Sequence, residues 1–95
     1  MNTSVDMARV EIERRLREIV VRALRLSKRA DEIQGVDLIA EMGVTSIDAL
    51  EILINVEMEF GIEVADSDLS QRLVASIPEL AIYVEQRLVR KPQTP

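Results

Sequence analysis

The sequence predicts an all-α fold, a small four-helix bundle with three main helices and one short helix. Apolar residues recur every three or four positions over long segments, which is the period of a helix face. Ser or Thr followed three residues later by an acid marks two helix starts, and no segment is a convincing strand. With 95 residues and 47% hydrophobic content, we expect one domain over 1–90, its core at about 9–89, and a disordered tail at 91–95.

The first helix is expected from about Val5 to Lys28, and its first turns are expected to fray or project. Its apolar positions form one stripe: Val5, Ala8, Ile12, Leu16, Ile19, Ala23 and Leu26. A loop follows, with Gly35 and Gly43 as breakers. Residues 38–42 could form a helical turn, and five apolar residues should anchor the loop in the core: Ile33, Val36, Leu38, Ile39 and Met42.

The second helix should span Ser46 to Phe60, with Thr45 as its N-cap, Asp48 completing a capping box and Gly61 as its stop. A helical wheel divides this helix into three sectors. The core face holds Ala49, Ile52, Leu53, Val56 and Phe60. The acidic face holds Asp48, Glu51, Asn55 and Glu59. The second apolar strip holds Ile47, Ile54 and Met58, with Leu50 close to it, and it packs under the long loop or binds a partner.

Two further elements follow the second helix. Asp66 is expected to cap a short helix around Ser67–Gln71. The last helix should begin after Ser76, with a proline in its first turn and Glu79 completing another capping box. Its apolar stripe comprises Ile77, Leu80, Ala81, Val84 and Leu88.

The composition excludes several classes of function. The chain has no cysteine and no histidine, which removes thiolate nucleophiles, Cys-type zinc sites, the commonest metal ligand and the usual neutral-pH base. Residues 31–70 carry eleven acids and no Lys or Arg, whereas residues 1–30 carry eight Lys/Arg and four acids. The acidic middle argues against nucleic acid binding and favours partners with basic surfaces.

The location of the protein is also expected from the sequence. The N-terminal segment lacks the basic and apolar regions of a secretory signal. No apolar run reaches the roughly 18 residues of a membrane span, so we expect a soluble, cytoplasmic protein without membrane insertion. We also expect the protein to be a monomer.

Ser46 is the residue whose chemistry needs an explanation. A serine at a helix start is most often a cap or a solvated first-turn residue. As a nucleophile it lacks a base, because the chain has no histidine. One role remains, acceptor of a phosphate-linked group supplied by another enzyme, and a helix N-terminus suits such a phosphodiester.

The segment EMGVTSIDALEILINVEMEFGIEVADSDL resembles the core of acyl carrier proteins, and a thinner similarity extends from about Ile12 to Leu88. The resemblance implies a non-enzymatic carrier whose Ser46 bears 4′-phosphopantetheine, attached from coenzyme A by a holo-carrier synthase (a phosphopantetheinyl transferase). The arm would supply the thiol that this cysteine-free chain lacks. The resemblance also implies docking of acyl-loading and acyl-transfer enzymes, through their basic patches, on Ile47, Asp48, Glu51, Ile54 and Met58.

Three departures from the family pattern suggest a specialised carrier with dedicated partners. Thr45 stands where the family usually has Asp, Met58 where many members have an acid, and Ala65 where Pro is common. The cargo is expected to be an acyl intermediate of fatty acid, polyketide or related lipid biosynthesis. Two alternatives remain open: a free-standing aminoacyl or peptidyl carrier, and an unmodified helical module that uses the second apolar strip as a dimer or adaptor face.

Overall fold

A computed structural model describes residues 2–90 of the chain, and the side chains of residues 9–89; the expected tail at 91–95 lies outside this range. The described residues form four α-helices and no strand, which confirms the predicted all-α fold. The helices are α1 (Asn2–Leu24), α2 (Leu38–Met42), α3 (Ser46–Phe60) and α4 (Ile77–Arg90). Two single-turn 3₁₀ segments, η1 (Ala30–Glu32) and η2 (Asp66–Asp68), lie in the connections.

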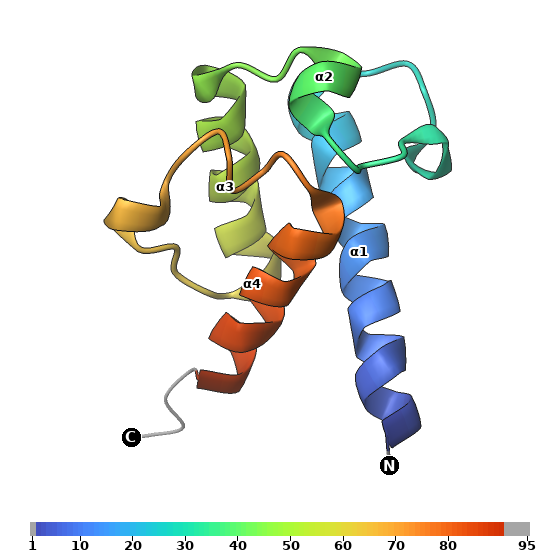
Figure 1. The fold of residues 1–95 in the computed structure, drawn as a ribbon, viewed down its shortest axis with the longest axis vertical. Helices are drawn as coiled ribbons and strands as arrows, with labels where there is room; N and C mark the ends of the chain where they lie inside the picture. Colours follow the sequence, from blue (N-terminus) through green and yellow to red (C-terminus); the bar gives the residue numbers. More distant parts are fainter. Residues whose placement is uncertain (1, 91–95) are drawn as a thin grey trace.

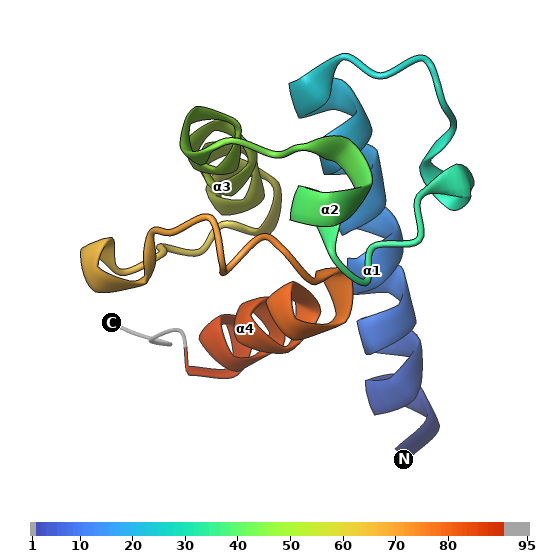
Figure 2. The same ribbon diagram turned by 45° about the horizontal axis from the view of Figure 1, so that its top comes forward.

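The three long helices enclose one aliphatic core. In Figure 1, α1 runs upward whereas α3 and α4 run downward, and α2 lies across the upper end. Figure 2 shows the segment before α4 passing between α2 and α4. The largest fully buried side chains come from every helix and from the loops: Leu16, Ile19, Val20, Leu38, Val44, Ile52, Leu53, Val56, Val74, Ile77, Leu80 and Val84.

The first helix differs from its prediction at both ends. It begins at Asn2, and its first turns extend past the end of α4 in Figure 1. It ends at Leu24 rather than Lys28, because Arg25 takes a left-handed conformation with φ of 55°. The N–H of Leu26 then donates to the Val21 carbonyl at 3.0 Å, and that of Arg25 to the Arg22 carbonyl at 3.2 Å. These two bonds are the Schellman pattern, which normally places glycine at the left-handed position.

The loop after α1 confirms most of its expected anchors. Ile33 and Leu38 are buried, Ile39 and Met42 are partly buried, and residues 38–42 form α2. Val36 was predicted to be an anchor, but its side chain is 73% exposed.

The backbone on both sides of Val36 explains this exposure. The Gly35 carbonyl accepts the Ile77 N–H at 2.7 Å, and the Leu38 N–H donates to the Ala75 carbonyl at 2.6 Å. The flanking residues therefore face the bundle with their backbone, and Val36 lies on the outer side of the turn.

The later elements follow local signals to different degrees. The bounds of α3 are those predicted, and Gly61 ends it in a left-handed conformation. In α4, the Ser76 hydroxyl accepts the Glu79 N–H at 3.3 Å, and the expected apolar stripe is buried apart from the half-buried Leu88.

The short helix predicted at Ser67–Gln71, with Asp66 as its cap, was wrong. The chain instead forms η2, preceded by Ala65 without a side-chain cap, and a turn at 71–75. A tertiary contact fixes η2, because the Tyr83 hydroxyl donates to Asp68 Oδ2 at 2.8 Å and accepts the Ala65 N–H at 3.3 Å. No helix within residues 2–90 has the length and apolar character to span a bilayer.

Candidate functional site

Ser46 is the first residue of α3, and its side chain is exposed. The residue before it caps the helix: Thr45 Oγ1 accepts the Asp48 N–H at 3.0 Å, and Asp48 Oδ2 accepts the Thr45 N–H at 3.0 Å. This reciprocal pair is the predicted capping box. The two neighbouring hydroxyls therefore differ in function, and the threonine alone is used for capping.

Ser46 remains available for chemistry because the Thr45 hydroxyl, and not that of Ser46, caps α3. Within the described residues, the Ser46 hydroxyl makes no hydrogen bond, and the N–H groups of Ser46 and Ile47 find no acceptor. Free N–H groups and the positive end of the helix dipole stabilise a negative charge placed beside them. An exposed hydroxyl in this setting fits a covalently attached phosphodiester.

A three-residue connection holds Ser46 in place. Gly43 ends α2 with φ of 67°, and its N–H donates to the Ile39 carbonyl at 2.9 Å. The Val44 side chain is 1% exposed and anchors the connection in the core. The Val44 carbonyl accepts Gln71 Nε2 at 2.6 Å. Sequence analysis missed Gln71, since no local pattern links residues 27 positions apart.

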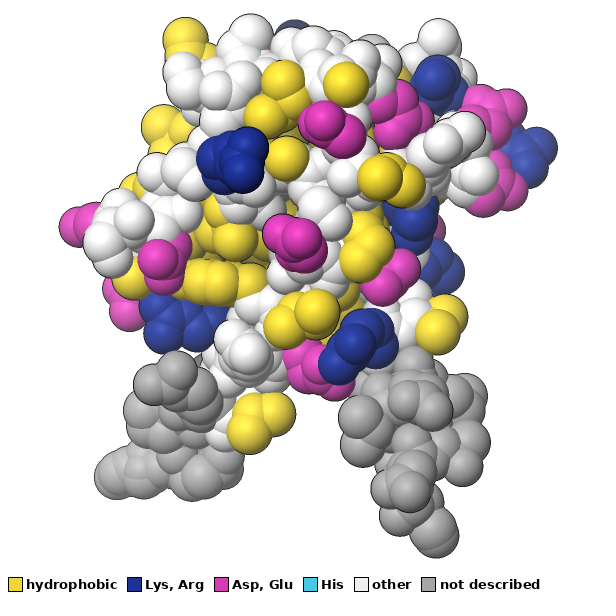
Figure 3. Space-filling view, viewed as in Figure 1, with side chains coloured by type: hydrophobic (Ala, Val, Ile, Leu, Met, Phe, Trp, Pro, Cys, Tyr) yellow, Lys and Arg dark blue, Asp and Glu magenta, His cyan; other side chains and the backbone are white. Residues whose placement is uncertain are grey.

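The second apolar strip is exposed on α3. Ile47 and Met58 are each 76% exposed, while Ile54 and Leu50 are about half exposed. Hydrophobic side chains are visible along the α3 side of the molecule in Figure 3. The strip therefore does not pack under the long loop, one of the two interpretations that the sequence left open.

The acidic face is less available than its sequence suggests. Asp48 is half-buried and occupied in the capping box, and Glu59 pairs with Arg15 of α1 at 3.3 Å. Asn55 Nδ2 donates to the backbone carbonyl of Glu51 at 2.8 Å. Glu51 is exposed, and its carboxylate has no ion pair within residues 9–89. One free carboxylate thus lies beside the exposed apolar strip.

Most cations of α1 are neutralised by acids of the same chain. Arg9 reaches Glu85 of α4 at 2.7 Å, in addition to the Arg15 contact with α3. On the exposed surface of α1, hydrogen bonds from Arg14 and then Arg15 lower the pKa of Glu11 to about 2. The arginines of the basic first helix therefore form ion pairs mainly with acids of α3, α4 and α1 itself.

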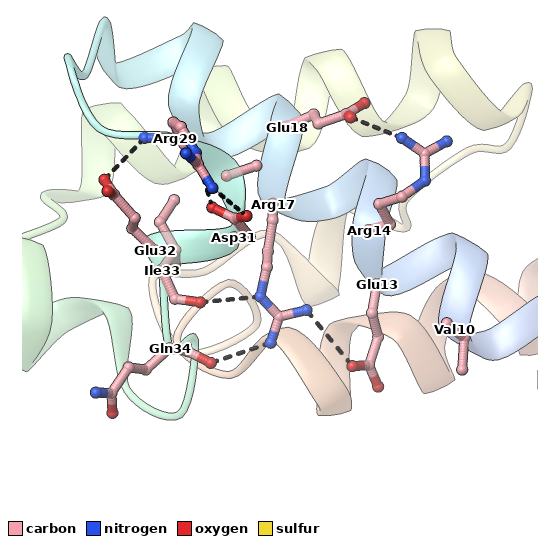
Figure 4. A pocket seen from close by; sticks show the side chains of 11 residues that line it. Val10, Glu13, Arg14, Arg17, Glu18, Arg29, Asp31, Glu32, Ile33 and Gln34 are labelled. Atoms are coloured by element: carbon pink, nitrogen blue, oxygen red, sulfur yellow. Dashed lines mark hydrogen bonds and ion pairs between the residues drawn. The ribbon is translucent and has the colours of Figure 1, made fainter.

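A groove between α1 and residues 29–34 is a structural junction rather than a second site. Figure 4 shows Arg17 pointing from α1 to this segment, where it donates to the carbonyls of Ile33 at 3.0 Å and Gln34 at 3.1 Å. Arg29 pairs with Asp31 at 2.7 Å. Ser46 is not among the lining residues, and the cations of the groove already have partners.

Glu41 of α2 fastens the same loop from the other side. Its two carboxylate oxygens each accept one backbone N–H at 3.0 Å, from Gln34 and Gly35. Desolvation acts to raise the pKa of Glu41, but these hydrogen bonds and the charges of Lys28 and Arg17 outweigh it and keep the pKa below its ordinary value. The contact orients α2, which leads directly into the connection before Ser46.

No group of three or more potential metal ligands occurs within the described residues.

A family model described as "Phosphopantetheine attachment site" matches residues 14–84. The chain is 36% identical over 72 residues to "Acyl carrier protein 2, chloroplastic" of Arabidopsis thaliana, and the match covers 76% of this chain and 52% of that protein. It therefore spans about half the length of this relative.

Two bacterial relatives are matched over nearly their whole length. The chain is 32% identical over 76 residues to an acyl carrier protein of Campylobacter hominis, covering 80% of this chain and 92% of the relative. It is 26% identical over 81 residues to an acyl carrier protein of Thermotoga maritima, covering 85% and 96%. No solved structure matches the chain with significance.

Proposed function

Since the chain belongs to the acyl carrier family, which contains the phosphopantetheine attachment site, we propose that Ser46 is its point of modification. Proteins of this family are carriers rather than enzymes, and they bear 4′-phosphopantetheine covalently. When bound, the arm supplies a thiol that holds acyl groups as thioesters. The proposed function is to present such acyl groups, attached through Ser46, to the enzymes that load and consume them.

The observation that supports this proposal most directly is that the adjacent hydroxyls of Thr45 and Ser46 differ in their hydrogen bonding. Thr45 closes the capping box, so the Ser46 side chain is exposed and makes no hydrogen bond within the described residues. The free N–H groups of Ser46 and Ile47, at the positive end of the helix dipole, would stabilise the negative charge of a phosphodiester attached to Ser46. A purely structural start to α3 needs the threonine but has no use for the serine.

We also propose that partners dock on the second apolar strip and the free acid beside it. Ile47, Ile54 and Met58 are exposed on the helix that begins at Ser46. Glu51 is the acid of this face that remains unpaired within residues 9–89, and Asp48 contributes one carboxylate already engaged with the backbone. A partner with a basic patch around an apolar depression would match this surface.

The finer assignments are part of the same proposal. The carrier unit spans residues 1–90, and the cargo is an acyl intermediate of fatty acid, polyketide or related lipid biosynthesis in the cytoplasm. The Thr45 cap and the apolar Met58, both exposed, support a specialised carrier with dedicated partners. An aminoacyl or peptidyl cargo would be revealed by the mass of the group carried on the native protein.

The attachment site is tested by intact mass spectrometry after incubation with coenzyme A and a phosphopantetheinyl transferase. The wild-type chain should gain the mass of one 4′-phosphopantetheine, and Ser46→Ala should gain none, because the acceptor oxygen is gone. Ser67→Ala removes another exposed serine and should be modified like wild type. No added mass on the wild type, or its persistence on Ser46→Ala, would favour an unmodified interaction module.

The docking surface is tested by the rate of the same modification as a function of carrier concentration. Glu51→Gln should raise KM for the transferase about threefold at low salt and less at high salt. A charge at the rim of an interface mainly speeds the encounter of the two proteins, and salt screens this attraction. Glu63→Gln removes an exposed acid beyond the end of α3 and serves as the matched control. Equal effects of the two substitutions would argue against a specific role for Glu51.

A further inference from the structure

The segment 71–77 lies against the segment that leads to Ser46. Its backbone is joined to residues 35–38 by two short hydrogen bonds, Leu38 N–H to the Ala75 carbonyl and Ile77 N–H to the Gly35 carbonyl. Figures 1 and 2 both show it passing between α2 and α4. Val74 and Ile77 are fully buried, so this segment, here called the brace, is held firmly in the core.

One side chain of the brace bonds to the connection of residues 43–45 that leads into Ser46. Gln71 is half-buried, and its Nε2 donates to the Val44 carbonyl at 2.6 Å. This carbonyl lies two residues before Ser46, and no other hydrogen bond to it occurs within the described residues. The carbonyl of the N-cap Thr45 accepts the Ala49 N–H as the first bond of the α3 ladder, so Val44 lies just outside this ladder.

We propose that Gln71 is a positioning residue for Ser46. The Val44 side chain fixes the depth of the three-residue connection in the core, and the Gln71 bond fixes the orientation of its last peptide. Both constraints act on the turn from which the serine projects, although Gln71 touches neither the serine nor any reacting atom. The functional part of this inference rests on the proposed attachment at Ser46, whereas the ordering of the turn does not.

The loss of this bond has a defined consequence. Without the Gln71 donor, the buried carbonyl loses its partner, and the connection between α2 and α3 samples other orientations. A partner enzyme that binds one orientation then meets a smaller competent fraction, so its apparent affinity falls while its rate at saturation is kept. The expected signature is therefore a higher KM for the transferase with an unchanged kcat.

Three variants separate the hydrogen bond from packing. Gln71→Met keeps the length of the side chain but removes the donor, and Gln71→Lys restores a donor at similar reach. Gln86→Met, on the exposed face of α4, is the matched control. The first readout is amide hydrogen exchange of Thr45 and Asp48, whose N–H groups are bonded in the capping box. The second is the KM and kcat of modification by the transferase.

We expect Gln71→Met to speed exchange at both amides about fivefold, the effect of one typical hydrogen bond, and to raise KM while kcat stays at the wild-type value. Gln71→Lys and Gln86→Met should behave like wild type. Wild-type exchange and KM in Gln71→Met would overturn the inference, as would equal losses in Gln71→Met and Gln71→Lys. If the wild type is not modified at all, the attachment proposal fails, and the exchange measurement still decides whether Gln71 orders the turn.

Discussion

Single atoms decide the chemistry at the start of α3. Thr45 and Ser46 carry the same functional group one residue apart, yet only Thr45 Oγ1 is within hydrogen-bond distance of the Asp48 N–H. A side chain at the N-cap turns back over the first turn, whereas the next residue projects outward. The difference between a structural and an available hydroxyl is thus a difference of one position in the helix.

Two glycines in the segments before Ser46 show how much a single position can constrain the backbone there. Both have positive φ, 79° at Gly35 and 67° at Gly43. A Cβ atom at Gly35 would lie 2.5 Å from Ile77 Cγ1 and 2.9 Å from Ile77 Cβ, but a Cβ at Gly43 would meet nothing within 4 Å. Gly43→Ala should therefore cost only the left-handed backbone strain, about 1–2 kcal/mol.

Gly35→Ala should cost the same strain and also the overpacking against Ile77, about 2–5 kcal/mol in total. Urea unfolding of the two variants, compared with wild type, measures both free energies. A loss at Gly35 no larger than that at Gly43 would show that the Ile77 contact relaxes freely.

At the scale of elements, local capping signals predict helix ends well only where the preferred residue occupies the cap. The ends of α3 carry Thr45 with Asp48 and Gly61, and the prediction of Ser46–Phe60 is confirmed. The first helix ends at an arginine in a position that favours glycine, so no sequence signal marked it. The prediction therefore extended the helix to Lys28, because the apolar spacing continued to Leu26.

Replacing this arginine gives a stability prediction at the same scale. Arg25→Gly should raise the free energy of unfolding by about 0.5–1 kcal/mol, since it relieves left-handed strain of about 1–2 kcal/mol and adds a smaller entropy cost. Arg22→Gly, three residues earlier within α1, is the control and should lose about 1 kcal/mol. Urea unfolding of both variants checks the pair, and destabilisation by Arg25→Gly would show that the arginine side chain makes a stabilising contact.

At the scale of the whole molecule, the charge segregation of the sequence is only partly a surface property. The acidic middle segment and the basic first helix meet in the fold, where Arg15 pairs with Glu59. Arg17 binds loop carbonyls, and Glu57 accepts the Val64 N–H at 2.8 Å. Two acids of the middle segment, Glu57 and Glu59, are thus used to hold the bundle. Glu51 remains as the free acid of the acidic face within residues 9–89.

The sequence by itself determined the all-α class, the bounds of α3, the capping box at Thr45 and the candidate hydroxyl of Ser46. These features depend on residues within a few positions of one another, and helix period and capping are local physics. Only the tertiary structure decided the 3₁₀ turn at η2, the exposure of Val36, the pairing of Glu59 and the bond from Gln71 to Val44. These features depend on contacts between residues far apart in the chain, which no local pattern encodes.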